Sequence, residues 1–310
     1  MPRMGAYRPA DRDAVIALWS RVFPADPVPA ERFDALLAAA GPDALTLAWE
    51  DAEPAGFVLA QAERPPGALP GVAGGPAGAS GSPARGWLTA FGVRDGSRRR
   101  GLGRALIDAA VARLRAAGCA TVRTGGPGEA YLVPGVDTAA YPAAAPLLGA
   151  AGFRPAGTVH GMARGLSAPL PPADPPAGVR YRAPAPGELP ALAAMVAAAL
   201  SPSWASVVRA APPELLLVAY AGRQPVGFAG SDLYAGCPGR FGPIGVSGDW
   251  RGSGIGRGLL DRTLTAMRDR GHRRAWFLWA PDSPAGQAMY RSAGFATDRS
   301  FQLLDLDLHG

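Results

Sequence analysis

The chain has 310 residues, 48% apolar and 18% charged, which is long enough for two globular domains that each bury a core. The formal net charge is +6, but the longest basic run is Arg98-Arg-Arg100, which argues against a nucleic-acid-binding tract. Cys119 and Cys237 are too few and too far apart for a disulfide framework or a metal site. The N-terminus has no apolar leader, and the longest apolar helical run, 190–200, is shorter than the roughly 20 residues that span a bilayer. The sequence therefore predicts a cytoplasmic protein.

The first part of the chain alternates segments with the periodicities of strands and helices. Residues 64–86 are almost wholly Pro, Gly, Ala and Ser, and predict a disordered loop. A stretch with five prolines, 165–178, predicts a linker. The expected elements before that linker are a strand at 4–9, helices at 11–22 and 30–39, strands at 45–49, 56–61 and 87–93, a helix at 104–117, a strand at 120–125, a helix at 142–151 and a last strand.

The second part repeats this order. Its expected elements are a strand at 179–182, a helix at 187–200, a hairpin within 214–233, a strand at 241–246, a helix at 257–270, a strand at 274–279, a helix at 284–293 and a strand at 298–307. We therefore predict an N-terminal domain over 1–164 and a C-terminal domain over 179–310, each with a twisted mixed sheet flanked by helices.

A glycine-rich turn stands between a strand and a helix in the second part, in the sequence Val246-Ser-Gly-Asp-Trp-Arg-Gly-Ser-Gly-Ile-Gly-Arg-Gly258. Glycine lets backbone N–H groups surround a ligand without interference from a Cβ atom. At a helix N-terminus, those N–H groups and the helix dipole favour an anion. The turn is thus a candidate phosphate site, and the alternative is a turn that only caps a core helix.

The same pattern occurs 153 residues earlier, where Arg98, Gly101 and Gly103 correspond to Arg251, Gly254 and Gly256. Both copies continue into an amphipathic helix that ends on glycine, and an Ala-Gly-Phe sequence follows in each, at 151–153 and 293–295. A shared order of several features indicates an internal duplication of about 140 residues. We call the two copies repeat 1 and repeat 2.

Better-known phosphate loops do not fit this turn. A P-loop ends in Gly-Lys-Ser/Thr, but the chain has no lysine. A dinucleotide-binding loop needs a small residue where repeat 2 has Leu259. Arg251-x-x-Gly254-x-Gly256 instead resembles the acetyl-CoA pyrophosphate loop of the GNAT superfamily of N-acetyltransferases, so the chain resembles a tandem GNAT protein. This resemblance implies two GNAT folds of the α/β (α+β) class and an enzyme that uses acetyl-CoA as co-substrate, without a metal.

The resemblance also implies the cofactor-binding residues. In the family, backbone groups of the strand before the loop hold pantetheine and the thioester, and the loop N–H groups hold the pyrophosphate. Carried over by position, the residues are Ile244, Val246, Arg251, Gly252, Gly254, Gly256 and Arg257 in repeat 2, and Phe91, Val93, Arg98, Arg99, Gly101, Gly103 and Arg104 in repeat 1. For the arginines of repeat 1, a solvated turn is the alternative interpretation.

The family's general acid is a tyrosine four residues before the Gly-Phe pair, which is Tyr290 here. Its phenol would protonate the leaving thiolate; the alternative is a tyrosine packed in the core. Leu148 stands at the matching place in repeat 1 and cannot donate a proton. We therefore expect the C-terminal domain to be catalytic and the N-terminal domain to be degenerate. The general base is open, with Asp232, Asp282, Glu214 or a water chain as candidates.

The expected reaction is direct attack of the primary amine of a small molecule on acetyl-CoA. Two alternatives stay open: a non-catalytic acyl-CoA-binding or sensing protein, and a tandem acetyltransferase similar to mycothiol synthase, from which the Ala280-Pro-Asp-Ser-Pro284 segment departs. A nucleic-acid partner and a membrane are not expected. The acceptor, the use of the N-terminal domain and the oligomeric state do not follow from the sequence.

Overall fold

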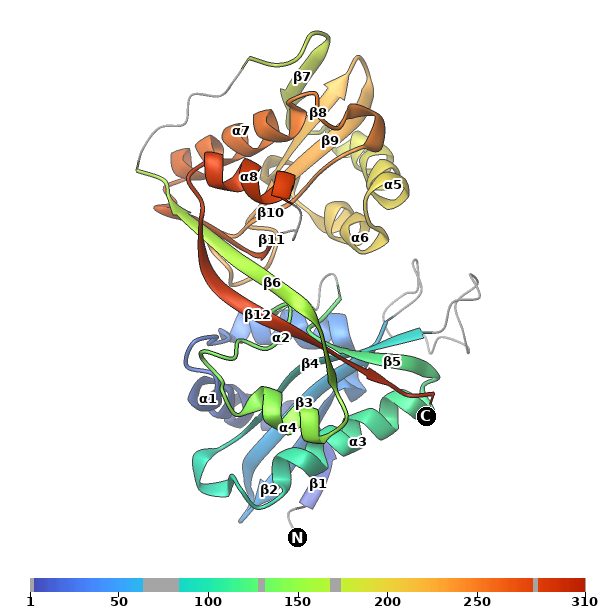
Figure 1. Cartoon of the computed structure of the whole chain (residues 1–310), viewed down its shortest axis with the longest axis vertical. Helices are drawn as coiled ribbons and strands as arrows, with labels where there is room; N and C mark the ends of the chain where they lie inside the picture. The colour runs from blue at the N-terminus through green and yellow to red at the C-terminus, as the bar shows by residue number, and fades with distance from the viewer. Residues whose placement is uncertain (1–2, 64–83, 128–131, 168–173, 281–283, 310) are drawn as a thin grey trace. The chain divides into compact units, whose positions relative to one another are not determined.

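The computed structural model describes residues 3–63, 84–127, 132–167, 174–280 and 284–309 (Figure 1). The chain forms two compact units. Unit 1 comprises Met1–Val159 together with Ser300–Gly310, and unit 2 comprises His160–Arg299. Most of the predicted loop at 64–86 and much of the predicted linker at 165–178 lie outside the described residues.

Unit 1 holds one sheet with helices on both faces. Its strands follow the order β1 (Arg3–Ala6), β2 (Leu45–Glu50), β3 (Glu53–Ala62), β4 (Ala84–Val93), β5 (Cys119–Thr124) and β12 (Ala296–Asp307), and only the β4–β5 pair is parallel. Its helices are α1 (Arg12–Val22), α2 (Ala30–Ala40), α3 (Leu102–Ala116) and α4 (Ala144–Ala150).

Alternation along β3 explains why both faces of this sheet are covered. Phe57 and Leu59 pack with α1 and α2, whereas Val58 and Ala60 pack with α3. Successive strand residues point to opposite faces, so a run that is apolar throughout requires a layer on each side. Trp19 of α1 stacks on Phe57 with ring centroids 4.9 Å apart.

Unit 2 repeats this plan with β7 (Val179–Arg182), α5 (Leu189–Ala199), α6 (Pro202–Ala210), β8 (Leu216–Ala221), β9 (Gln224–Ser231), β10 (Phe241–Val246), α7 (Ile255–Asp269), β11 (Arg274–Ala280) and α8 (Pro284–Ser292). One antiparallel sheet has the order β10-β9-β8-β7, and β11 pairs with β6 (Arg154–Gly165). Helices α5 and α6 pack on one face of the first sheet, and α7 and α8 pack with the core on the other.

The two repeats exchange their last strands. The end of β12, in the second half of the sequence, pairs with β5 of unit 1 through Asp305↔Arg123, Leu306↔Val122 and Asp307↔Thr121. The end of β6, in the first half, pairs with β11 of unit 2. The boundaries of the compact units therefore differ from those expected at 164 and 179. Which strand the end of β6 or β12 pairs with depends on long-range contacts that the local sequence does not encode.

A further difference is α6, which the expected helix at 187–200 did not include. The helix follows Ser201 and begins with Pro202, a pair typical of a helix start. Among the described residues, no helix is long and apolar enough to cross a membrane.

Candidate functional site

Strand β10 presents a free backbone edge in unit 2. The Ser247 N–H donates to Val226 O on β9, so by alternation the N–H and C=O groups of Ile244 and Val246 point away from β9. Within the described part of the chain, β11 meets this other edge only at the isolated bridge between Arg240 and Trp276. Beyond this bridge the two strands are not paired, and among the described residues the N–H groups of Ile244 and Val246 have no strand partner.

Strand β4 of unit 1 has the same arrangement. The Arg94 N–H donates to Ala55 O on β3, which directs the backbone groups of Phe91 and Val93 to the opposite edge. There β5 accompanies β4 only up to Leu88, whose carbonyl accepts the last bond from the Gly125 N–H. Both repeats therefore place the four predicted strand residues on an open edge.

A register shift lies at the base of each free edge. In β10 it falls between Phe241 and Ile244, and in the β3–β4 ladder between Leu59 and Ala60, which leaves Thr89 as the extra residue of β4. A bulge of this kind bends a strand and redirects the groups beyond it. The two strands thus part from their neighbours at corresponding places.

The glycine-rich turn of unit 2 leads directly from this edge into α7. Gly252 and Gly254 have φ angles of 78° and 86°, and a Cβ atom on either would meet nothing within 4 Å. The first bond of the helix runs from the Gly258 N–H to Gly254 O, and no side chain caps the N-terminus. The N–H groups of residues 255–257 therefore precede the helical ladder, directly after two glycines with open surroundings, which fits an anion.

The turn of unit 1 has the same backbone with a different side chain. Gly101 caps α3 with a φ of 84°, and no side chain caps the helix. Arg99 takes a φ of 63° at the position where unit 2 has Gly252. A left-handed φ is unfavourable for an L-residue, so this arginine stays there at a cost in stability. The conformation of the turn is conserved between the two units although the residue type is not.

The second glycines of the turns have a packing role in the structure. A Cβ atom on Gly103 would lie 3.1 Å from Leu147 Cδ2, and one on Gly256 would lie 3.5 Å from Met289 Sδ. Both positions face the next helix, α4 or α8. A Cβ atom would therefore make an ordinary contact at Gly256 and a slightly tight one at Gly103, so the space at both positions suits a small residue.

The arginines of the turns are largely held by the protein itself. The Nε groups of Arg98 and Arg251 donate to the carbonyls of Val93 and Val246, at 2.9 and 3.3 Å, and fasten each turn to its strand. Arg104 and Arg257 donate through Nε to a carboxylate one helical turn later, Asp108 in unit 1 and Asp261 in unit 2. Their contribution to an anion site therefore comes chiefly from backbone N–H groups.

Tyr290 lies in the core of unit 2, with 6% of its surface exposed. Its ring contacts Phe277 at a centroid distance of 4.5 Å and Phe295 at 5.9 Å. Burial raises the pKa of Tyr290 to about 12, so the phenol keeps its proton to a higher pH than an exposed tyrosine and is a weaker acid than one. Leu148, at the matching position of unit 1, is fully buried in the core cluster of that unit.

The two candidate bases that the structure describes, Asp232 and Glu214, are not placed next to the turn. Asp232 accepts bonds from the Gly239 N–H and from His272 and Arg270, next to the start of β10 and at the opposite end of that strand from the turn. Glu214 is exposed before β8, and Asp282 lies outside the described residues. In the described part of the chain, no group of three or more His, Cys, Asp or Glu residues could hold a metal ion.

Comparison with protein-family models gives two matches. Residues 12–126 match the Acetyltransferase (GNAT) family, and residues 212–297 match the Acetyltransferase (GNAT) domain. The second match includes the glycine-rich turn of repeat 2 and Tyr290. No curated protein matches the sequence.

Three solved structures share the fold over 99% of this chain. A GCN5-related glucosamine N-acetyltransferase region of a fungal multi-domain GH3 β-N-acetylglucosaminidase has a TM-score of 0.79 at 20% identity, and this chain spans 38% of its length. A GCN5-related N-acetyltransferase from Sphaerobacter thermophilus has a TM-score of 0.73 at 22% identity, with 95% of its length covered. A tandem GNAT protein from the clavulanic acid biosynthesis pathway has a TM-score of 0.70 at 17% identity, with 98% covered.

At these identities the solved structures establish the fold alone. The family models match both repeats in sequence, and the resemblance of the chain to a tandem GNAT protein is thereby confirmed. GNAT proteins use acetyl-CoA as co-substrate, and the open turn and free strand edge suit such an elongated anion. The chain therefore belongs to the GNAT superfamily, as an acyltransferase with two GNAT domains in tandem.

Proposed function

We propose that unit 2 transfers the acetyl group of acetyl-CoA to the primary amine of a small molecule by direct attack. The observation that carries this proposal is the combination of three features in one unit: a free strand edge, an open turn at a helix N-terminus and a tyrosine on α8 at the position of the family's general acid. Unit 1 has the first two features but has Leu148 in place of the phenol. The proposal therefore assigns turnover to unit 2.

In the proposed reaction, the N–H groups of residues 255–257 hold the pyrophosphate of CoA. The N–H groups of Ile244 and Val246 bind pantetheine and the thioester oxygen, on which negative charge develops. The amine nitrogen forms a bond to the acetyl carbon, the carbon–sulfur bond breaks, and the Tyr290 phenol gives its proton to the thiolate. The attacking amine loses its proton to water or to a base that we do not assign.

We propose that unit 1 binds acetyl-CoA without turning it over. Its free edge at Phe91 and Val93 and its turn at Gly101 reproduce the backbone geometry of unit 2. Arg99 adds an exposed positive charge at a position where unit 2 has glycine. We therefore expect each unit to bind one acetyl-CoA, of which only the molecule in unit 2 reacts.

Calorimetry with acetyl-CoA tests the binding part of the proposal. Gly254→Asp places a carboxylate at the anion site of unit 2, and Gly101→Asp does the same in unit 1. We expect two sites in the wild type and the loss of one site in each variant, with a drop in affinity of at least about 10-fold from like-charge repulsion. A wild type that binds no acyl-CoA would remove the basis for both sites.

Tyr290→Phe tests the catalytic part. Removal of a general acid lowers turnover by about 10²-fold, whereas the acetyl-CoA affinity of unit 2 should stay within about twofold because the ring still packs in the core. The assay follows release of the CoA thiol with a panel of small primary amines, and Tyr234→Phe is a control in the same unit. If a productive amine is found and Tyr290→Phe keeps full turnover, Tyr290 is not the acid.

A further inference from the structure

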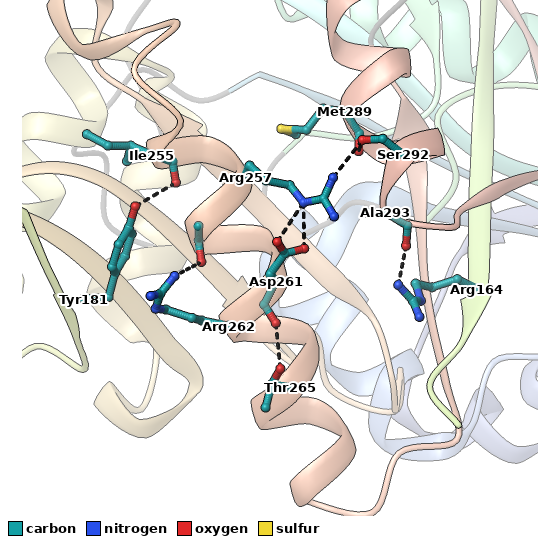
Figure 2. Close-up of polar contacts among 11 residues, drawn as sticks. Arg164, Tyr181, Ile255, Arg257, Asp261, Arg262, Thr265, Met289, Ser292 and Ala293 are labelled. Carbon is teal, nitrogen blue, oxygen red and sulfur yellow. Dashed lines mark hydrogen bonds and ion pairs between the residues drawn. The ribbon is translucent and has the colours of Figure 1, made fainter. Parts of the chain in front are cut away.

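A chain of polar contacts connects the helix of the glycine-rich turn, α7, with the helix that carries Tyr290, α8 (Figure 2). Arg257, the third residue of α7, donates from Nε to both carboxylate oxygens of Asp261, at 2.8 and 2.7 Å. The same guanidinium donates from a terminal nitrogen to Ser292 Oγ at 2.8 Å. Ser292 Oγ in turn donates to Met289 O at 2.9 Å. One side chain therefore ties the start of α7 to the last turn of α8.

The centre of this network is buried. The Asp261 side chain is only 2% exposed, and a carboxylate at that depth needs its cation, because removal of one partner leaves an uncompensated buried charge. Arg164 of β6 approaches from the other side and donates to the carbonyl of Ala293, directly after α8 (Figure 2). Two guanidinium groups thus hold the C-terminal end of α8.

Unit 1 provides an internal comparison for this network. Arg104 and Asp108 have the same spacing on α3, but the Asp108 side chain is 53% exposed. Ala150 stands at the position of Ser292, and Arg104 donates to its backbone carbonyl instead of a hydroxyl. The buried, hydroxyl-bridged form therefore occurs in the unit that has a tyrosine, and the exposed form in the unit that has Leu148.

We propose that Arg257, Asp261 and Ser292 are positioning residues for Tyr290. The inference rests on the proposed function, in which Tyr290 is the general acid of unit 2. Catalytic groups must be held to within about 0.5 Å of the productive geometry, and α8 is only nine residues long. Ser292 is two residues after Tyr290, so a bond at Ser292 fixes the turn of helix that carries the phenol. In the proposed reaction the backbone N–H of Arg257 helps to hold the pyrophosphate, and the side chain of the same residue would align the acid with the bound donor.

Ser292→Ala is the cleanest test, because unit 1 shows that the fold accepts alanine at this position. The variant removes the hydroxyl bond to α8, leaves the Arg257–Asp261 pair in place and gives the arrangement of unit 1, in which the arginine bonds only a backbone carbonyl of the next helix. Ser292→Thr keeps a hydroxyl that can bond an earlier carbonyl of the helix, and it should restore the wild-type rate. Asp269→Asn, an exposed carboxylate on α7 that pairs with Arg268, is the control for changes on the same helix.

The decisive measurement is a double-mutant cycle with Tyr290→Phe, on the full chain. The rate of thiol release from acetyl-CoA is followed with water and with small primary amines as acceptors. We expect Ser292→Ala to lower kcat about 10-fold, with KM for acetyl-CoA within about twofold, because a misplaced group loses transition-state contacts. In the Tyr290→Phe background the same change should alter kcat less than about twofold, since no acid remains to be positioned.

The positioning role would be overturned if Ser292→Ala lowered kcat equally in the wild-type and Tyr290→Phe backgrounds, or if it changed KM alone. Either result would leave the assignment of Tyr290 as the acid intact. Full turnover in Tyr290→Phe would overturn the acid itself, and with it the role of the network. A second measurement needs no turnover: acetyl-CoA should slow amide hydrogen exchange in α8 of the wild type, and Ser292→Ala should reduce that effect about threefold. If acetyl-CoA slows exchange in α8 equally in the wild type and in Ser292→Ala, the bond at Ser292 does not connect the donor site to the acid.

Discussion

The burial of Tyr290 predicts a specific weakness of unit 2 at alkaline pH. Burial raises the pKa of Tyr290 to about 12 from an ordinary value of 10.0. Between these two values the unfolded chain loses the phenol proton while the folded chain keeps it, so the folded state binds more protons and stability falls as pH rises. The contribution of the Tyr290 phenol to the free energy of unfolding is fully present below pH 10 and is lost as pH rises through 12.

The size of the effect follows from the two pKa values. A difference of about 2 units corresponds to about 2.7 kcal/mol when the whole range is crossed, and about 2 kcal/mol of this is lost by pH 11.5. Tyr290→Phe removes the ionisable group but keeps the ring against Phe277 and Phe295. The variant should therefore lose about 2 kcal/mol less than the wild type between pH 9 and pH 11.5.

Urea unfolding followed by tryptophan fluorescence, at a series of pH values, measures this difference. Other tyrosines also ionise in the range, but they are common to both proteins and cancel in the comparison. Tyr234→Phe, a tyrosine outside the Phe277 cluster, controls for loss of a phenol as such. Parallel pH curves for wild type and Tyr290→Phe would show that the phenol reaches solvent and that burial does not raise its pKa.

Three further variants test separate parts of the structure. Arg99→Gly should stabilise unit 1 by about 0.5–1 kcal/mol, because it relieves a left-handed φ at the expense of a more flexible unfolded chain, and thermal unfolding measures the gain. Leu304→Ala should destabilise unit 1 by about 2–4 kcal/mol although it lies in the second half of the sequence, and hydrogen exchange should rise in α3 and not in α7. Gly258→Ala should cost about 1–3 kcal/mol in urea unfolding, because its Cβ would lie 2.4 Å from Tyr181 Oη, and Tyr181→Phe in the same protein should recover part of that loss.

The elements that the sequence predicts well are those with a local cause. The strand, turn and helix around Gly254 follow from apolar runs, a glycine with positive φ and an amphipathic period, and each of these acts within a few residues. Helix α6 also has local signals: Ser201 and Pro202 at its start, and Trp204 and Val208 one helical turn apart. The sequence-based prediction did not separate it from the helix expected at 187–200, because the two helices follow each other closely.

The exchange of strands has no such local cause. Strands β6 and β12 each follow an Ala-Gly-Phe sequence, have twelve residues and share a similar burial pattern, so the pairing partner of either end cannot be read from its own residues. Pairing depends on which neighbouring edge is available once the sheets have formed. The sequence therefore indicates that the strands exist but not which sheet each end completes.

The arginines of the two turns show a different limit of what can be predicted from sequence. Their positive charge beside a glycine-rich turn suggests phosphate binding, yet Arg104 and Arg257 each have an aspartate four residues later on the same helix. That spacing is visible in the sequence and favours an ion pair within the helix. What the sequence cannot show is that Asp261 is buried and Asp108 exposed, because the difference depends on what packs over the helix, including Arg164 of β6.

The two units together show which parts of the site are backbone and which are side chain. The free edges and the open turns consist of backbone groups, so they persist in both units even where Arg99 replaces a glycine. In the proposed mechanism, proton donation depends on one side chain, and Leu148 fills its place in the core of unit 1 without disturbing the fold. If the proposal holds, donor binding and acid catalysis are physically separable in this chain. A duplicated unit can lose the second with a single substitution and keep the first, because the sheet and the helix that make the donor site are also needed for its core.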